Sequence, residues 1–241
     1  EWPRIKAVVG TLIARSCDDT GFLLIDKKRD RIFLDWIDED TERYTAAQIM
    51  WWRALGAAAT LASRMDDADA KEAWASHQGR LRDSLSSQCQ DNTSNGLWLE
   101  SPHFLGKYSR HATMLAAVWK LNDYLSPQDS AVAVDRLLGP DLAPAGTPYM
   151  KILECLAIAN LGRSEEAVER MHAYWGGMLN QNATTFWESF DHDNKDAYSM
   201  YGRSWAKSLC HAWASGPLFF LPQVKLGIVP LKDGWTEWAF N

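Results

Sequence analysis

The sequence predicts an all-α fold built from antiparallel helical hairpins. Apolar residues recur at helical spacing along nearly the whole chain. The turns between these segments alternate between short and long, which is typical of hairpins packed side by side. No sequence unit repeats at a fixed length, so a solenoid of regular repeats is disfavoured.

The expected elements follow in chain order. Residues 5–13 carry the apolar positions of a first helix, which ends at turn-forming residues 18–21. Residues 22–36 are expected to form a charged loop, whose two short apolar patches are candidates for paired strands. Further helices are expected over residues 44–65, 66–87, 109–124, 127–138, 149–161, 164–175 and 205–220.

Local residue choices support these boundaries. The segment 44–65 is rich in alanine, which suits close approach between helices. The segment 66–87 begins with aspartates, which suit a helix N-cap and the positive end of the helix dipole. Gly176 and Gly177 are expected to end one helix, and Pro222 is expected to end the last.

Composition restricts the class of partner. The net charge is −6 and no cluster of Lys and Arg occurs, so a nucleic-acid partner is not expected. The apolar stretches are too short for a membrane span, so no membrane partner is expected; the cellular compartment stays open. The chain contains 13 Trp, which fit either a helical core or a sugar site, because an indole ring can cover the C–H face of a pyranose.

The four cysteines give no sign of a metal site. No C-x-x-C pair occurs, and no motif for zinc, phosphate or another cofactor is present, so neither a metal nor a cofactor is expected. Cys155 and Cys210 lie in apolar helical contexts and are expected to be buried thiols.

Glu188 is the first candidate for catalysis. It lies between large aromatic residues in a loop that separates two predicted helices. Apolar neighbours disfavour a charged carboxylate and raise its pKa, which suits acid–base chemistry near neutral pH. The residues alone leave an alternative open, in which Glu188 caps the following helix or pairs with Arg203.

Two further segments carry polar groups of interest. His211 shares a helical face with Ser204 and Lys207 in the predicted helix 205–220, although a histidine there could equally be a core residue. Asp35 and Trp36 follow a charged loop, for which a solvated run of charges is the alternative interpretation.

Six segments of the chain together resemble the α-L-rhamnosidases of the six-hairpin glycosidase group. They match in the same order, and the Thr-Thr-Phe-Trp-Glu and Ser-Leu-Cys-His motifs are the more specific ones, although Ala212 replaces the glycine of the family pattern. The six segments are residues 33–36, 109–112, 147–150, 183–188, 208–213 and 226–230.

The resemblance implies an incomplete (α/α)₆ toroid and an inverting hydrolase for terminal α-L-rhamnose or a related sugar. Glu188 would be the general base that activates water. Trp36, Asp35 and His211 would contact the sugar, and Trp187 would support Glu188 from behind. We expect Glu188 to lie within reach of His211 and Trp36.

One part of the family pattern is not found. The general acid belongs to an acidic motif upstream of the Asp-Trp loop; residues 26–31 resemble its middle, but the Gly-Asp that should follow is absent. We therefore expect residues 1–225 to be a helical catalytic-type domain without its first hairpins. Residues 226–241 are expected to be a linker towards a missing β-sandwich. A fragment and a shortened homologue both fit this pattern.

Two other functions remain open at this point. The chain could be a sugar-binding domain or pseudoenzyme that lacks the acid, or a helical toroid for protein contacts. Uncovered apolar helix faces lead us to expect a homodimer.

Overall fold

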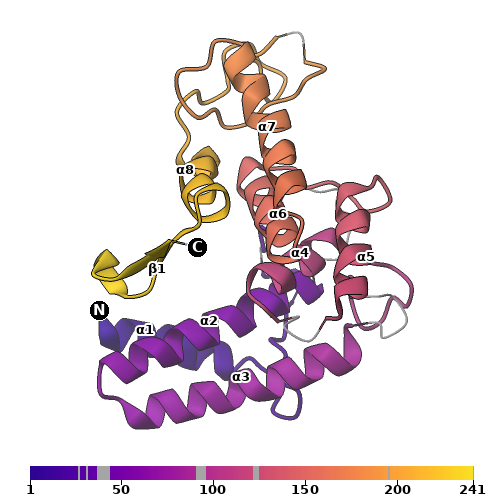
Figure 1. The fold of residues 1–241 in the computed structure, drawn as a ribbon. Coiled ribbons are helices and arrows are strands. Elements are labelled where there is room, and N and C mark those ends of the chain that lie inside the picture. The colour runs from indigo at the N-terminus through magenta and orange to yellow at the C-terminus, as the bar shows by residue number, and fades with distance from the viewer. Residues whose placement is uncertain are drawn as a thin grey trace.

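The computed structural model describes residues 1–26, 28–30, 32–36, 44–90, 96–121, 125–194 and 196–240. Helices dominate this part of the chain (Figure 1). The α-helices are α1 (Trp2–Ile13), α2 (Tyr44–Arg64), α3 (Ala68–Gln88), α4 (Arg110–Val118), α5 (Pro127–Leu138), α6 (Pro148–Asn160), α7 (Ser164–Asn180) and α8 (Gly216–Phe220).

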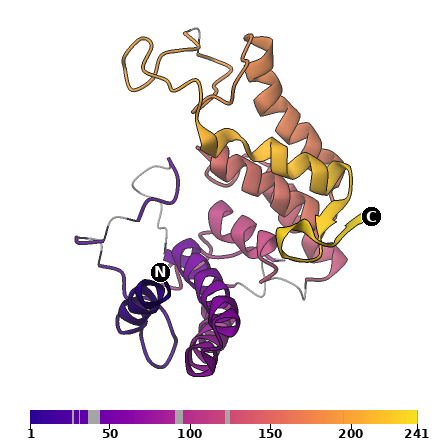
Figure 2. The ribbon, with the colours of Figure 1, turned by 90° about the vertical axis from the view of Figure 1, so that its left-hand side faces the viewer.

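The helices form two rows. Helices α2, α4, α6 and α8 contact one another in this order and make one row. Helices α1 and α3 pack on α2, α5 packs on α4 and α6, and α7 packs on α6, which makes a second row outside the first. This arrangement confirms the expected all-α fold of helical hairpins. In Figures 1 and 2 the long loop after α7 gathers at one end of that helix.

Side-chain caps explain several of the helix starts. Ser109, Ser126 and Thr147 each accept a hydrogen bond from the backbone N–H three residues later. Pro127 and Pro148 occupy the first turns of α5 and α6, where a missing N–H costs nothing. Asp67 caps α3 in the same way, as expected.

Helix α7 does not end at its glycines. It continues through Gly176 and Gly177 to Asn180. A Cβ atom on Gly177 would lie 2.2 Å from Cε1 of Phe190, so this glycine allows the Phe190 ring to approach the helix. The glycine therefore serves packing rather than termination.

The predicted helix over residues 205–220 is wrong for most of its length. Only α8 is α-helical, and it continues into a π-helical turn, Leu221–Lys225, that contains Pro222. Residues 207–211 instead bond to distant backbone: the N–H groups of Lys207 and His211 donate to the carbonyls of Tyr198 and Phe186. The polar stripe expected from Ser204, Lys207 and His211 does not exist, because these residues share no helix.

Three smaller expectations also change. Helix α4 ends at Val118, and the rest of the predicted helix includes residues 122–124, which lie outside the described residues. The described part of 22–36 contains no strand, only an isolated pairing of Leu23 with Ser16. Cys155 is buried as expected, but Cys210 is exposed because its segment is not helical.

The chain ends in a small hairpin. Strands β1 (Ile228–Pro230) and β2 (Trp238–Phe240) pair antiparallel, with Val229 opposite Ala239. Arg64 at the end of α2 forms an ion pair with Asp233 of the hairpin at 2.6 Å. Among the described helices, none is both long and apolar enough to cross a membrane.

Candidate functional site

Glu188 lies in the loop after α7, and each oxygen of its carboxylate accepts a hydrogen bond. Oε1 accepts from the Tyr201 hydroxyl at 3.0 Å, and Oε2 accepts from the Ser208 backbone N–H at 3.0 Å. Burial and the neighbouring carboxylate raise the pKa of Tyr201, so its hydroxyl remains a donor at neutral pH. These contacts replace the expected alternatives of a helix cap or a pair with Arg203.

Tyr201, which donates to this carboxylate, belongs to a group of aromatic rings that contact one another. The Trp36 ring packs edge-on against Trp213, with centroids 5.1 Å apart, and against Tyr201, with centroids 6.4 Å apart. His211 stacks on Trp213 at 4.4 Å, and the Trp213 indole N–H donates to the Glu188 carbonyl at 2.9 Å. The structure thus brings Glu188, Trp36 and His211 together. With Tyr201 and Trp213 they make five residues, which we call the Glu188 cluster.

Backbone pairing within the long loop assembles most of the cluster. The Glu188 N–H donates to the Ser208 carbonyl at 2.8 Å, and the His211 N–H donates to the Phe186 carbonyl at 2.8 Å. Glu188 and His211 come from segments about twenty residues apart, so this pairing fixes their distance. Within the described residues, the buried Nδ1 of His211 has no hydrogen-bond partner. That nitrogen is the unsatisfied polar group of the cluster.

Trp187 is buried beneath the loop and its ring is not part of the Glu188 cluster. Its side chain is buried, with the Tyr198 ring 5.7 Å away and the Lys207 ammonium 5.8 Å above its face. Burial lowers the pKa of Lys207, opposed by the nearby carboxylates of Asp191, Asp196 and Glu188. The geometry fits a supporting position for Trp187, not direct contact with a ligand.

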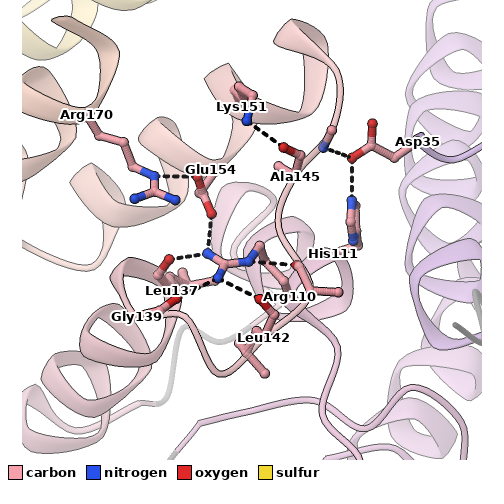
Figure 3. Close-up of polar contacts among 12 residues, drawn as sticks. Asp35, Arg110, His111, Leu137, Gly139, Leu142, Ala145, Lys151, Glu154 and Arg170 are labelled. Carbon is pink, nitrogen blue, oxygen red and sulfur yellow. Dashed lines mark hydrogen bonds and ion pairs between the residues drawn. The ribbon is translucent and has the colours of Figure 1, made fainter. Parts of the chain in front are cut away.

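Asp35 is also buried, unlike its neighbour Trp36. Its carboxylate accepts hydrogen bonds from the Trp36 N–H, the His111 ring and the N–H groups of Gly146 and Thr147, all at 2.7–2.8 Å. Figure 3 shows the bond from the His111 ring. Burial raises its pKa, but these hydrogen bonds outweigh it and the pKa of Asp35 lies below its ordinary value. Direct sugar contact, as the sequence suggested, does not suit a carboxylate with four donors already in place.

An ionic group stabilises the helices below the site. Glu154 of α6 accepts from Arg110 of α4 and from Arg170 of α7, and both Arg110 and Glu154 are almost fully buried (Figure 3). Arg110 also donates to backbone carbonyls at the end of α5, namely those of Leu137, Gly139, Leu142 and Ala143. This group joins α4, α5, α6 and α7.

Sequence reasoning did not single out four residues that shape the site. Trp213 and His111 lie within segments that resemble the family, but the resemblance assigned no role to either residue. Tyr201 and Gly146 lie in loops, where no periodicity marks a contact. Among the described residues, no group of three or more His, Cys, Asp or Glu side chains is placed to hold a metal ion.

Comparisons with known proteins identify the family to which this fold belongs. The model of the bacterial α-L-rhamnosidase six-hairpin glycosidase domain matches residues 1–224. The rhamnosidase from Klebsiella oxytoca with rhamnose bound has a TM-score of 0.74 at 27% identity, over 93% of this chain and 42% of that one. The GH78 family rhamnosidase of Bacillus sp. GL1 has a TM-score of 0.74 at 23% identity, over 97% of this chain and 24% of that one.

The chain thus spans less than half the length of either solved rhamnosidase. A search of curated proteins found no match. The family match covers all of α1–α8, and with them the Glu188 cluster. The chain therefore belongs to the bacterial α-L-rhamnosidase six-hairpin glycosidase domain family.

Proposed function

We propose that this chain provides the general-base side of an inverting α-L-rhamnosidase, with Glu188 as the base. One observation carries the proposal: the Glu188 carboxylate is fixed by Tyr201 and Ser208, and Tyr201 itself packs against the Trp36 ring. A base must be ionised and correctly oriented before it can remove a proton from water. Two donors on separate oxygens hold the Glu188 carboxylate in one orientation.

The reaction would proceed by direct displacement. Glu188 accepts a proton from a water molecule, the water oxygen bonds to the anomeric carbon, and the glycosidic oxygen leaves with a proton from an acid. Inverting enzymes place the two carboxyl groups about 6.5–9.5 Å apart so that water fits between the base and the sugar. The Glu188 cluster contains one carboxyl group, and we assign no residue to the acid.

A terminal α-L-rhamnosyl group is the substrate we propose. The solved rhamnosidase at 27% identity holds rhamnose. The rings of Trp36 and Trp213 offer apolar faces for the C–H groups of the sugar, while His211 offers a polar ring for a hydroxyl. We further propose that residues 1–225 act as the helical catalytic-type domain, with residues 226–241 as a linker towards a β-sandwich.

The single carboxyl group favours one second candidate, a sugar-binding domain without catalysis. Calorimetric titration with rhamnose and hydrolysis of p-nitrophenyl α-L-rhamnoside separate the two. Nitrophenolate leaves readily, so this substrate makes little demand on a general acid. We expect rhamnose binding by both the wild-type chain and Glu188→Gln, with turnover only in the wild type. Equal binding with no turnover in either would reject the enzyme and support the binding domain.

A further inference from the structure

Trp36 is the one member of the Glu188 cluster that comes from outside the loop after α7. It lies on a short segment before α2, and its ring packs against Trp213 and Tyr201. The backbone pairing that fixes Glu188 and His211 does not reach it. Its position must therefore be set by other contacts.

Asp35 supplies the first of these contacts. Its carboxylate is buried and accepts from the Trp36 N–H at 2.8 Å. It also accepts from the His111 Nε2 atom at 2.7 Å, and from the N–H groups of Gly146 and Thr147 at 2.7 Å each. One carboxylate thus ties the backbone of Trp36 to the beginnings of two helices.

Both attachment points belong to the starts of helices. His111 is the second residue of α4, and Thr147 is the N-cap of α6. Lys151, one turn into α6, donates to the Ala145 carbonyl at 2.6 Å (Figure 3). Its ammonium group also lies over the Tyr174 ring. Residues 145–147 are therefore bonded to Asp35 through two N–H groups and to Lys151 of α6 through the Ala145 carbonyl. A shift of this turn would disturb the start of α6.

Gly146 adds a steric condition. A Cβ atom there would lie 2.4 Å from the carbonyl oxygen of Trp36 and 3.1 Å from its Cβ. The nearest atom is backbone, so a rotation of a side chain cannot relieve the clash. The backbone of Gly146 is not in the left-handed region, so close approach, not conformation, requires the glycine here.

We propose that His111 and Gly146 are positioning residues that act through Asp35 and hold Trp36 against Trp213 in the sugar site. Neither residue is part of the Glu188 cluster. This positioning role rests on the proposed function, because it requires the Glu188 cluster to be the site where the sugar binds. A displaced Trp36 ring weakens contact with the sugar in both the ground state and the transition state, so affinity falls more than kcat.

The main test compares Gly146→Ala with Gly79→Ala. A Cβ atom on Gly79, in α3, meets no atom within 4 Å. We expect Gly146→Ala to weaken rhamnose binding by about tenfold or more, with kcat changed by less than about threefold, and Gly79→Ala to bind like the wild type. Equal affinities for the two variants would overturn the proposal.

A double-mutant cycle tests whether Trp36 transmits the effect. In a Trp36→Ala chain, Gly146→Ala should cause no further loss of rhamnose affinity, because the ring it displaces is gone. A full additional loss would show that Gly146 acts on another part of the site and would overturn the proposal. His111→Gln, which keeps a donor for Asp35, should retain more affinity than His111→Leu.

A second readout does not depend on sugar. In the chain labelled with 5-fluorotryptophan, the Trp36 resonance is identified by its loss in Trp36→Phe. We expect Gly146→Ala and His111→Leu to shift this ¹⁹F resonance and Gly79→Ala to leave it in place. If the Trp36 resonance shifts in the two variants but the wild type does not bind rhamnose, the proposed function is rejected and the positioning role stands. If the resonance stays in place in both variants, the positioning role is rejected.

Discussion

Neighbouring residues at this site have different surroundings and different tasks. Trp36 joins the Glu188 cluster, whereas Asp35 is buried among helix ends. Glu188 is half-buried with its carboxylate in the cluster, whereas Trp187 is buried behind it. In each pair one residue forms the site and its neighbour fixes that residue in place.

Arg110 is the residue on which the helix packing depends most clearly. Replacing it with Lys removes the planar set of donors that serves several carbonyls and Glu154 at once. We expect Arg110→Lys to lower the free energy of unfolding by about 1–3 kcal/mol, because the charge is kept but buried carbonyl groups lose their donors. Urea denaturation measures the difference.

The matched control for this change is Arg82→Lys. Arg82 is exposed and pairs with the adjacent Asp83. That substitution should change the free energy of unfolding by less than about 0.5 kcal/mol. If Arg110→Lys were no more destabilising than Arg82→Lys, the buried group would not join the helices as described.

At the residue scale, the sequence predicted the grouping of Glu188, Trp36 and His211, because the motifs that carry them match a family in order. It could not predict which of two adjacent residues faces the cluster. That choice depends on loop backbone angles and on partners such as Gly146 and Thr147, more than one hundred residues from Asp35. The contact of Tyr201 with Glu188 was missed for the same reason.

At the scale of elements, the two glycines of α7 make a direct test of packing. Gly176→Ala should raise the free energy of unfolding by up to about 1 kcal/mol, because alanine favours a helix and the new Cβ meets no atom within 4 Å. Gly177→Ala should lower it by about 1–3 kcal/mol, because the new Cβ overlaps the Phe190 ring. Chemical denaturation of both variants gives the answer. Equal effects of the same sign would contradict the packing of Phe190 on α7.

Helix starts were predictable and one long helix was not. The capping residues Asp67, Ser109 and Thr147 act within three residues of themselves, so the local sequence contains the whole interaction. Residues 205–215 have helical spacing, but their backbone groups bond to residues 186–188 and 198. Such long-range bonds override local periodicity, and the sequence does not show them.

At the scale of the molecule, the row α2, α4, α6 and α8 places the helix starts that hold Asp35 beside the loop that holds Glu188. The starts of α4 and α6 provide His111, Gly146 and Thr147, while the loop after α7 provides the rest. The hairpin order was predictable from alternating turn lengths. The convergence of these ends was not, because it depends on how the rows pack.

The exposed apolar surface leads to a prediction about association. A cavity of about 520 Å³ lies between α7 and α8, and its lining is almost entirely apolar. Leu179 and Leu218 line it and remain largely exposed, at 68% and 67%. Apolar surface of this kind is uncommon on monomers, so we expect the chain to form a homodimer through this face.

Sedimentation velocity over a range of protein concentrations tests the dimer. We expect Leu218→Glu to weaken association. Leu105→Glu, at a leucine that is 87% exposed and outside the cavity lining, should leave association unchanged. A monomer at every concentration would contradict the prediction.

The role of Glu188 as general base is tested most directly by kcat of Glu188→Gln on p-nitrophenyl α-L-rhamnoside. Gln keeps the size of the side chain and can still accept from Tyr201 or Ser208, but it cannot take a proton from water. We expect kcat to fall by about 10²- to 10⁴-fold with rhamnose affinity nearly unchanged. A variant that turns over as fast as the wild type would show that Glu188 is not the base.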